Sequence, residues 1–280
     1  MTGHLLRIAG ITCLAALCIS YPFLPGPYDS LAAPLSGMVQ GTSMLSAILV
    51  TPIAILWLVS EARHSSHVFR YRVATAVASF VVGAAVVLMG LGSIGVSLAL
   101  PLLAAWLYAL WKVIRSLRRL KTLPHVGFDP SPLYFAAVPL LLVIFQFAAA
   151  RPATDISRRR AMQAAGEIIS ELEQYRAREG RYPPSLLGIW KDYDPSVVAV
   201  ERFHYSPHGE AYSLFFEQPR FVHDQFGTRE FVVYNPRDEH LIVSHTAWML
   251  RHPPERLQSR QGWYAVRDAS QPHWKYFWFD

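Results

Sequence analysis

Histidines are the residues of this sequence best suited to chemistry, because a neutral imidazole both binds metal ions and transfers protons near pH 7. Seven of the 11 histidines follow residue 150, and they include two close pairs, His204 with His208 and His240 with His245. A zinc site needs three or four convergent ligands at recognisable spacing. None of these histidines matches such a pattern, so we predict turn and surface histidines, with no metal site and no cofactor.

Nucleophilic hydrolysis is the second chemistry to consider, and Ser213 and Ser244 are its candidates. The sequence contains no Gly-x-Ser-x-Gly elbow to expose a nucleophile and no glycine-rich loop to hold a phosphate. We therefore predict no catalytic residue and favour a non-enzymatic protein. The alternative is a membrane-embedded enzyme or transporter whose outer domain regulates it.

Charge is divided unevenly along the chain. Residues 1–150 hold 9 Lys/Arg and 3 Asp/Glu, whereas residues 151–280 hold 17 of each, so the net charge of +6 belongs to the first part. The whole chain is 52% hydrophobic and only 16% charged, against about 25% charged for soluble domains. A basic excess confined between apolar stretches indicates membrane topology. We expect the lipid bilayer, and no nucleic acid, as a partner.

Five apolar stretches meet or approach the roughly 20 residues that a membrane-spanning helix needs. They cover residues 8–24, 44–59, 73–92, 94–114 and 133–150. The first two are short, so four spans are an alternative. We expect loops at 25–40 and at the Gly-rich turn 90–93, and aromatic side chains such as Trp57 and Trp106 at the lipid boundary.

Basic residues in the loops predict the orientation. Arg63, Arg70 and Arg72 precede the third stretch, and a run at 112–121 follows the fourth, which places both loops in the cytoplasm by the positive-inside rule. With five spans and a cytoplasmic N-terminus, everything after residue 150 lies outside. The basic residues Arg151 and 158–160 argue in the other direction.

The interiors of the predicted spans favour packing over transport. They contain no ionisable side chain, which argues against a proton-coupled pump. Thr75, Ser79 and Gly83 recur every four residues, so they lie on one helix face, where small residues let helices pack closely.

After residue 150 the sequence becomes polar. Pro152 is expected to loosen the junction, and Thr154 or Asp155 to cap a new helix over residues 155–179. Its apolar stripe has helical spacing and consists of Ala161, Ala165, Ile168, Leu172 and Tyr175. Gly180 is expected to end the helix.

The end of this helix carries a specific motif. Tyr175 is followed by Gly180, which ends the helix, and by Tyr182-Pro183, which turns the chain back onto it. Over residues 133–216 this resembles the pilin-like proteins of bacteria, especially the major pseudopilin of type II secretion. The resemblance implies a membrane helix that continues into an amphipathic helix, followed by an antiparallel sheet packed on that helix.

The resemblance also implies a location and a role. It places the pilin-like α+β domain at 151–280 outside the bacterial cytoplasmic membrane, anchored by the span at 132–150. The apolar stretches add a four-span region at 1–131, which that family lacks, so we expect a multi-pass protein. Its partners would be proteins of an envelope or secretion assembly. Gly127-Phe128 lacks the glutamate that follows a prepilin cleavage site, and no calcium-binding loop is found, so the resemblance extends to the domain only.

Alternating apolar residues predict up to six strands. They cover residues 200–205 and 211–216 around a turn at 206–209, 231–234 and 241–244 around a turn at 235–238, and 263–266 and 274–279. Residues 248–260 are expected to form a connection or a short helix. In the last strand Trp274, Tyr276 and Trp278 share one face. We expect core and sheet edge there; if exposed, these three form an interaction surface.

Overall fold

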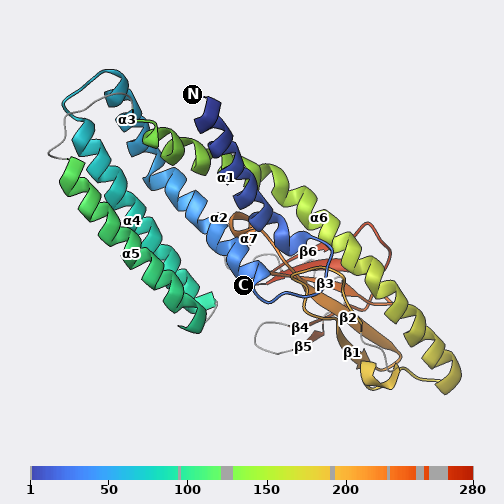
Figure 1. Ribbon diagram of the computed structural model, residues 1–280. Coiled ribbons are helices and arrows are strands. Elements are labelled where there is room, and N and C mark those ends of the chain that lie inside the picture. Colours follow the sequence, from blue (N-terminus) through green and yellow to red (C-terminus); the bar gives the residue numbers. More distant parts are fainter. Residues whose placement is uncertain are drawn as a thin grey trace. The chain divides into compact units, whose positions relative to one another are not determined.

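The computed structural model describes residues 2–93, 96–120, 129–189, 193–225, 228–243, 249–251 and 264–279 (Figure 1). The chain forms two compact units. Unit 1 contains Met1–Tyr21 and Ala33–Ala149, and unit 2 contains Pro22–Ala32 and Ala150–Asp280. The boundary near residue 150 lies where composition placed it. The sequence did not indicate that Pro22–Ala32 belongs with the C-terminal part.

Unit 1 is built of helices. They are α1 (Thr2–Ser20, continued by the 3₁₀ turn Tyr21–Phe23), α2 (Ala32–Leu49), α3 (Thr51–Ala62), α4 (Val68–Ser93), α5 (Val96–Leu120) and the first part of α6 (Ser131–Glu179). Within the described residues three helical stretches, Thr2–Phe23, Val68–Gly92 and α6, are long and apolar enough to cross a membrane. The bent pair of α2 and α3 adds a fourth if it forms one span.

The apolar side chains of these helices point outward. Only 17 to 22% of the residues in their apolar windows are buried, and Leu6, Leu88 and Ile144 are 74%, 68% and 64% exposed. Apolar surface of this extent is stable in lipid and unstable in water. The helices therefore support a membrane protein, whereas the number of spans stays a prediction.

The second predicted span is two helices instead of one. Helices α2 and α3 meet at Val50 with a bend of 51°. Pro52 lies in the first turn of α3, where its missing N–H costs nothing because the first N–H groups of a helix have no partner within it. Since α2 begins at Ala32, half of the predicted loop 25–40 is helical.

Two further expectations in unit 1 are corrected. Residues 90–93, predicted as a turn, form the end of α4, and positions 94 and 95 lie outside the described residues. Helix α5 continues to Leu120, so Lys112, Arg115, Arg118 and Arg119 lie on a helix instead of in a loop. Arginine, lysine and leucine are strong helix formers, which explains the extension.

The predicted seam of small residues packs α4 against α5. Thr75 is 1% exposed, and a Cβ atom added to Gly83 would lie 2.6 Å from Cδ1 and Nε1 of Trp106 on α5. The missing side chain of Gly83 therefore accommodates the indole ring. Trp106 packs in this seam against Phe80, and Trp57 is buried against Phe135, while the expected aromatic belt at the lipid boundary stays a prediction.

Helix α6 runs without a break for 49 residues. The prediction of a junction at Pro152 and of a new helix start at Thr154 or Asp155 is wrong. The helix continues through Pro152 because a proline in a helix interior removes only one backbone hydrogen bond, and the neighbouring turns keep their hydrogen bonds. The predicted end is confirmed. Gly180 follows the helix with φ +72°, and its N–H donates to the Arg176 carbonyl at 2.8 Å.

Unit 2 contains a five-stranded antiparallel sheet. Its order is β1 (His204–His208), β2 (Ala211–Gln218), β3 (Arg229–Tyr234), β7 (Trp274–Phe279) and β6 (Tyr264–Asp268). A short helix, α7 (Val222–Gln225), follows β2. Strands β4 (Leu241–Val243) and β5 (Met249–Arg251) pair separately.

Three details of the predicted strands differ from the structure. Strand β1 begins at His204 and continues through residues 206–208, so the turn is at Gly209 and Glu210, where Gly209 has φ +58°. Strand β5 lies in the segment expected to be a connection or a short helix. Strand β7 is internal to the sheet, between β3 and β6. Ser244, His245, Trp248 and Trp263 lie outside the described residues.

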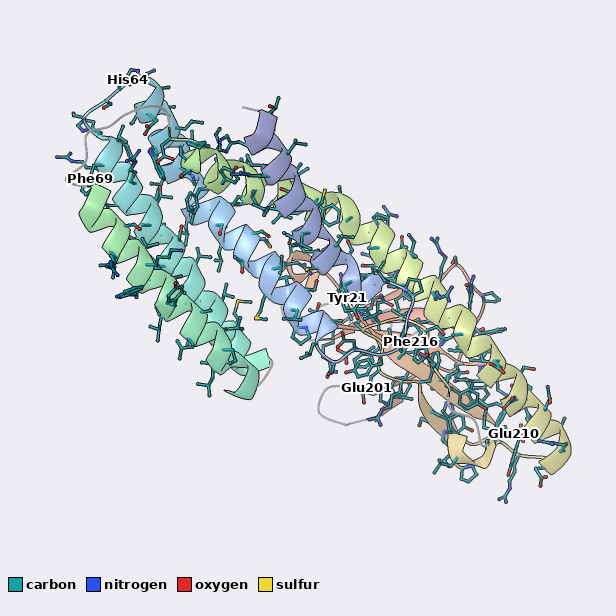
Figure 2. The ribbon with its side chains drawn as sticks, in the orientation of Figure 1. Tyr21, His64, Phe69, Glu201, Glu210 and Phe216 are labelled. Atoms are coloured by element: carbon teal, nitrogen blue, oxygen red, sulfur yellow. The ribbon has the colours of Figure 1, made fainter. Side chains whose placement is uncertain are left out.

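One face of the sheet packs on the predicted apolar stripe of α6. Ala161, Ala165, Ile168 and Leu172 are all 0% exposed and meet Phe216 and other side chains of this core (Figure 2). Tyr182 is 7% exposed, and its ring lies edge-on to Tyr212 at 4.7 Å. The chain after Gly180 therefore folds back onto the helix as the motif predicts.

The segment between α1 and α2 is part of the fold of unit 2. The Val198 N–H donates to the Leu24 carbonyl at 3.0 Å, and the Asp29 N–H donates to the Val198 carbonyl at 2.8 Å. Phe23 is 4% exposed and packs on Phe221. Because these segments form one compact unit, they lie on the same side of any membrane that the helices cross.

Candidate functional site

The sheet face that packs on α6 is apolar at one end and polar at the other. Antiparallel partners share a face, and the register places Val232 opposite Tyr276 and Glu230 opposite Trp278. Near Val232 this face is apolar core. Near Glu230 it becomes polar, where the Gln218 amide donates to the Ser157 hydroxyl of α6 at 2.5 Å.

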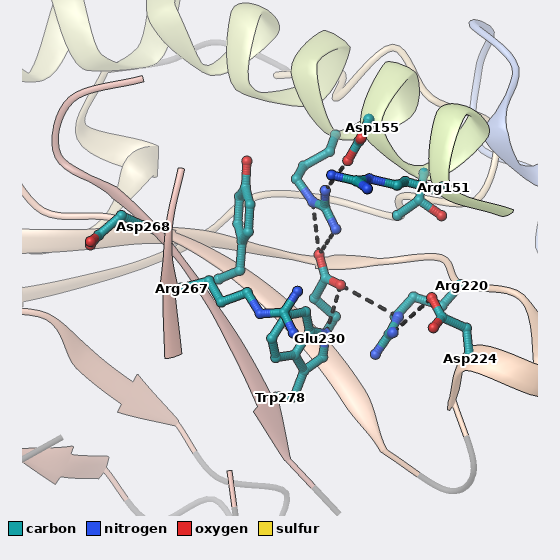
Figure 3. A pocket seen from close by; sticks show the side chains of 11 residues that line it. Arg151, Asp155, Arg220, Asp224, Glu230, Arg267, Asp268 and Trp278 are labelled. Atoms are coloured by element: carbon teal, nitrogen blue, oxygen red, sulfur yellow. Dashed lines mark hydrogen bonds and ion pairs between the residues drawn. The ribbon is translucent and has the colours of Figure 1, made fainter. Parts of the chain in front are cut away.

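A pocket of about 520 Å³ opens at this polar end (Figure 3). Helix α6, the α7 region and strands β3, β6 and β7 supply its walls. The lining residues are four arginines, four carboxylates and three others: Arg151, Arg158, Arg220, Arg267, Asp155, Asp224, Glu230, Asp268, Thr154, Tyr276 and Trp278.

Glu230 is the buried anion of the pocket, with its side chain 0% exposed. Arg158 donates through Nε and Nη2 to Oε1 at 2.8 and 2.5 Å. Trp278 Nε1 donates to Oε2 at 2.7 Å, and Arg220 Nε lies 3.4 Å from the same oxygen. Both carboxylate oxygens are therefore occupied, as a buried charge requires.

The two arginines that face Glu230 also bind two further carboxylates of the pocket, those of Asp155 and Asp224. Arg158 Nη1 donates to Asp155 at 2.6 Å, and Arg220 Nη2 lies 2.8 Å from Asp224. The guanidinium of Arg158 lies 4.2 Å from the centre of the Tyr276 ring, where cation–π attraction adds to the ion pairs. Burial is the main cause that raises the pKa of Tyr276, and the Arg158 charge opposes it.

The other two arginines of the pocket have no ion pair within the part of the chain that the structure describes. Arg151 on α6 and Arg267 on β6 are both exposed. The Arg267 guanidinium lies 4.5 Å from the centre of the Trp278 ring, which fixes its position beside Glu230. Asp268 points away from this group (Figure 3) and pairs with Lys275 at 3.5 Å.

The residues that the sequence singled out lie in two places. Tyr175, Gly180, Tyr182 and Pro183 gather at the end of α6, where Tyr182 donates to Glu173 at 2.9 Å and Tyr205 donates to the Pro183 carbonyl at 2.8 Å. Their role there is to hold the loop on the helix. Of the aromatic strand, Trp274 is core at 4% exposure, whereas Tyr276 and Trp278 line the pocket.

The described histidines of unit 2 make contacts with aromatic rings, carbonyls and carboxylates of the fold. His204 stacks on Phe215 with ring centroids 5.1 Å apart. His240 is 1% exposed between the carbonyls of Asp238 and His273, and burial lowers its pKa. Among the described residues no three His, Cys, Asp or Glu side chains are grouped closely enough to hold a metal ion.

A second buried ionic cluster lies in unit 1. The side chain of Glu61 on α3 is 2% exposed, accepts a hydrogen bond from Trp57 Nε1 at 3.1 Å, and lies 3.5 Å from Nη2 of Arg72 on α4. The same Nη2 is 3.0 Å from Asp129, just before α6. This cluster ties three helices together at their ends. Arg72 therefore lies on a helix and not in the predicted loop.

No protein-family model, curated protein or solved structure matches this chain.

Proposed function

We propose that this protein is a membrane anchor whose unit 2 acts outside the bacterial cytoplasmic membrane as a pilin-like interaction module of an envelope or secretion assembly. One observation carries the proposal: the chain passes between the two units three times, at Tyr21–Pro22, Ala32–Ala33 and Ala149–Ala150. A domain tethered in this way stays with its membrane helices.

The order of elements in unit 2 supports the pilin-like part. An apolar helix continues into an amphipathic one, Gly180 and Tyr182-Pro183 return the chain, and an antiparallel sheet covers the apolar stripe. Three passages of the chain between the two units tether unit 2 to the helices, which favours a stationary component that meets a partner over a subunit inserted into a pilus.

The buried charges of unit 1 support a structural role for the membrane helices. Glu61, Arg72 and Asp129 lie at helix ends and compensate one another. Ion-transport paths place ionisable groups within the spans. In the described candidate spans of unit 1 charged residues such as Arg7, Glu61 and Arg72 lie near helix ends, which argues against the rival function, a transporter regulated by unit 2.

Cysteine labelling in cells tests the orientation. In a Cys13→Ser/Cys18→Ser background, Glu210→Cys places a thiol at the exposed β1–β2 turn and His64→Cys places one between α3 and α4. A membrane-impermeant maleimide should label position 210 in cells with a permeabilised outer membrane and position 64 only after lysis. The reverse pattern would overturn the proposal.

Photocrosslinking tests the interaction. Leu187, the most exposed large apolar side chain of unit 2 at 80%, is replaced by a benzoylphenylalanine, with Gly166 on the outer face of α6 as the control position. We expect a discrete protein adduct with the probe at position 187 and none with the probe at position 166. In a second experiment the probe replaces Leu186, and Leu187→Asp should weaken the adduct formed there. Adducts at neither position would contradict an interaction module.

A further inference from the structure

We propose that the arginine-lined pocket of unit 2 binds a phosphate group that carries one negative charge, held between Arg151 and Arg267. The inference does not depend on the proposed function, because it rests on the charges and geometry of the pocket alone.

The charges of the pocket leave room for one anion. Arg158 and Arg220 face Glu230, Asp155 and Asp224, so these five groups together carry one negative charge. Asp268 is neutralised by Lys275 outside the group. Adding Arg151 and Arg267 gives one positive charge in excess, which matches the single charge of a phosphodiester.

The two arginines that have no carboxylate partner among the described residues come from different walls. Arg151 is on α6 and Arg267 is on β6. A guanidinium presents paired N–H donors that fit the oxygens of a phosphate, and such charge-assisted bonds are about twice as strong as neutral ones. Stacking on Trp278 holds Arg267 in place before a ligand arrives, which lowers the entropy cost of binding.

The buried network beneath them makes the pocket a built site. Glu230 is held by two arginines and an indole N–H, and the guanidinium of Arg220 also lies 5.2 Å from the centre of the Trp278 ring. The hydroxyl of Thr154 is buried without a hydrogen-bond partner among the described residues, whereas Arg220 Nε lies 3.4 Å from Glu230. The wall is therefore held in place by ion pairs and offers the Thr154 hydroxyl as a donor.

The pocket residues on α6 follow the apolar stretch of that helix directly in sequence. Arg151 follows Ala150, the last residue of the apolar stretch, and at 1.5 Å per residue Arg158 is about 12 Å farther along α6. Arg220 precedes Phe221, which packs on Phe23 beside the first crossing. The polar headgroup layer extends roughly 5–8 Å beyond the hydrocarbon on each side. A lipid headgroup and a soluble phosphate compound can both reach such a pocket.

Calorimetric titration of the full chain in a neutral detergent distinguishes the two sources. The probes are dioctanoyl phosphatidylglycerol, inorganic phosphate and, as a phosphate-free control, dioctanoyl glycerol. We expect the phosphatidylglycerol to bind and the dioctanoyl glycerol not to bind. Binding of inorganic phosphate with equal strength would assign the pocket to a soluble phosphate compound, and much weaker binding would assign it to a lipid headgroup.

Two matched double variants test the residues. Arg151→Gln/Arg267→Gln removes the two pocket cations, whereas Arg159→Gln/Arg160→Gln removes two exposed cations of α6 that do not line the pocket. The first should raise the Kd at least about tenfold, as loss of charge-assisted bonds does, and the second less than about twofold, with unchanged melting temperatures. Equal losses in both variants, or no binding of either phosphate probe to the unaltered chain, would overturn the proposal.

Discussion

Phe23, at the end of the first apolar helix, stacks on Phe221 of unit 2 with ring centroids 4.7 Å apart and planes inclined by 16°. Both rings are almost completely buried. The segment between α1 and α2 is therefore a structural part of unit 2, so a fragment that begins at residue 151 lacks one of its core side chains.

Phe23→Ala tests this dependence. Truncating a buried phenylalanine costs about 3–5 kcal/mol of unfolding free energy, through lost burial and the cavity that remains. We expect a marked fall in the melting temperature of the full chain in detergent. Tyr28→Ala on the same segment is the control, because Tyr28 is 46% exposed and its loss should change stability little.

Glu230→Gln tests the buried charge network. Arg158 and Arg220 would lose their shared carboxylate, and breaking a buried ion pair on one side costs about 3–5 kcal/mol. Denaturant unfolding in detergent measures the effect. Glu217→Gln, which breaks the half-exposed ion pair with Arg229 on the same two strands, should cost less than about 1 kcal/mol. Equal costs would mean that burial does not govern the role of Glu230.

Gly83→Ala tests the packing of α4 on α5. The new Cβ would meet the Trp106 indole at 2.6 Å, and overpacking of this kind costs about 1–3 kcal/mol. Heat-induced aggregation followed by size-exclusion chromatography should begin at a lower temperature. Gly92→Ala is a control on the same helix, because nothing lies within 4 Å of its added Cβ. A Trp106→Leu change should relieve the defect of Gly83→Ala.

Gly180 and Gly166 predict opposite effects of the same substitution. Alanine at position 180 must adopt φ +72°, which costs about 1 kcal/mol or more. Alanine at the exposed helical position 166 should stabilise α6 by up to about 1 kcal/mol. Melting temperatures of the two variants should move in opposite directions, and a shift of the same sign in both would contradict the role of Gly180 as a helix stop.

Three histidines make the stability of unit 2 depend on pH. Burial is the largest cause that lowers the pKa of His204, His223 and His240. Below the unfolded value of about 6.5 the unfolded chain binds more protons than the folded one, so the free energy of unfolding falls as the pH falls. Melting temperatures should decrease from pH 7.5 to pH 5.5.

His240→Gln tests which histidine contributes to this dependence. His240 is the most deeply buried of the three; Lys275 lowers its pKa further, while Asp238 and hydrogen bonds to two carbonyls oppose that shift. The variant will be less stable at pH 7.5, but its melting temperature should change less between the two pH values. An unchanged difference would exclude His240 as a contributor.

Helical periodicity and glycine position predicted the part of the fold that depends on local chemistry. The stripe from Ala161 to Leu172 and the stop at Gly180 follow from side-chain spacing and from backbone freedom, and both are confirmed. The break at Pro152 is absent because one lost hydrogen bond is small beside the packing that holds α6. Local propensity alone cannot predict that outcome.

The pocket escaped sequence analysis because its parts come from distant segments. Glu230, Val232 and Tyr234 are two residues apart along one strand, so they share a face, and the alternation of the strand indicates a carboxylate on its inward face. Its partners Arg158 and Arg220 could not be identified in this way. Arg158 belongs to a run of arginines and Arg220 to a loop, and the local sequence does not show which carboxylate either of them contacts. Tyr276 and Trp278 were singled out as aromatic, and the structure places them in the pocket wall.

The pairing of Pro25 with Val197 also sets the order in which the protein can fold. Helices α2 to α6 lie between the two residues in sequence, so the first segment is synthesised before these helices and its partner after them. Unit 2 can therefore be completed only when the whole helical part of the chain has been made.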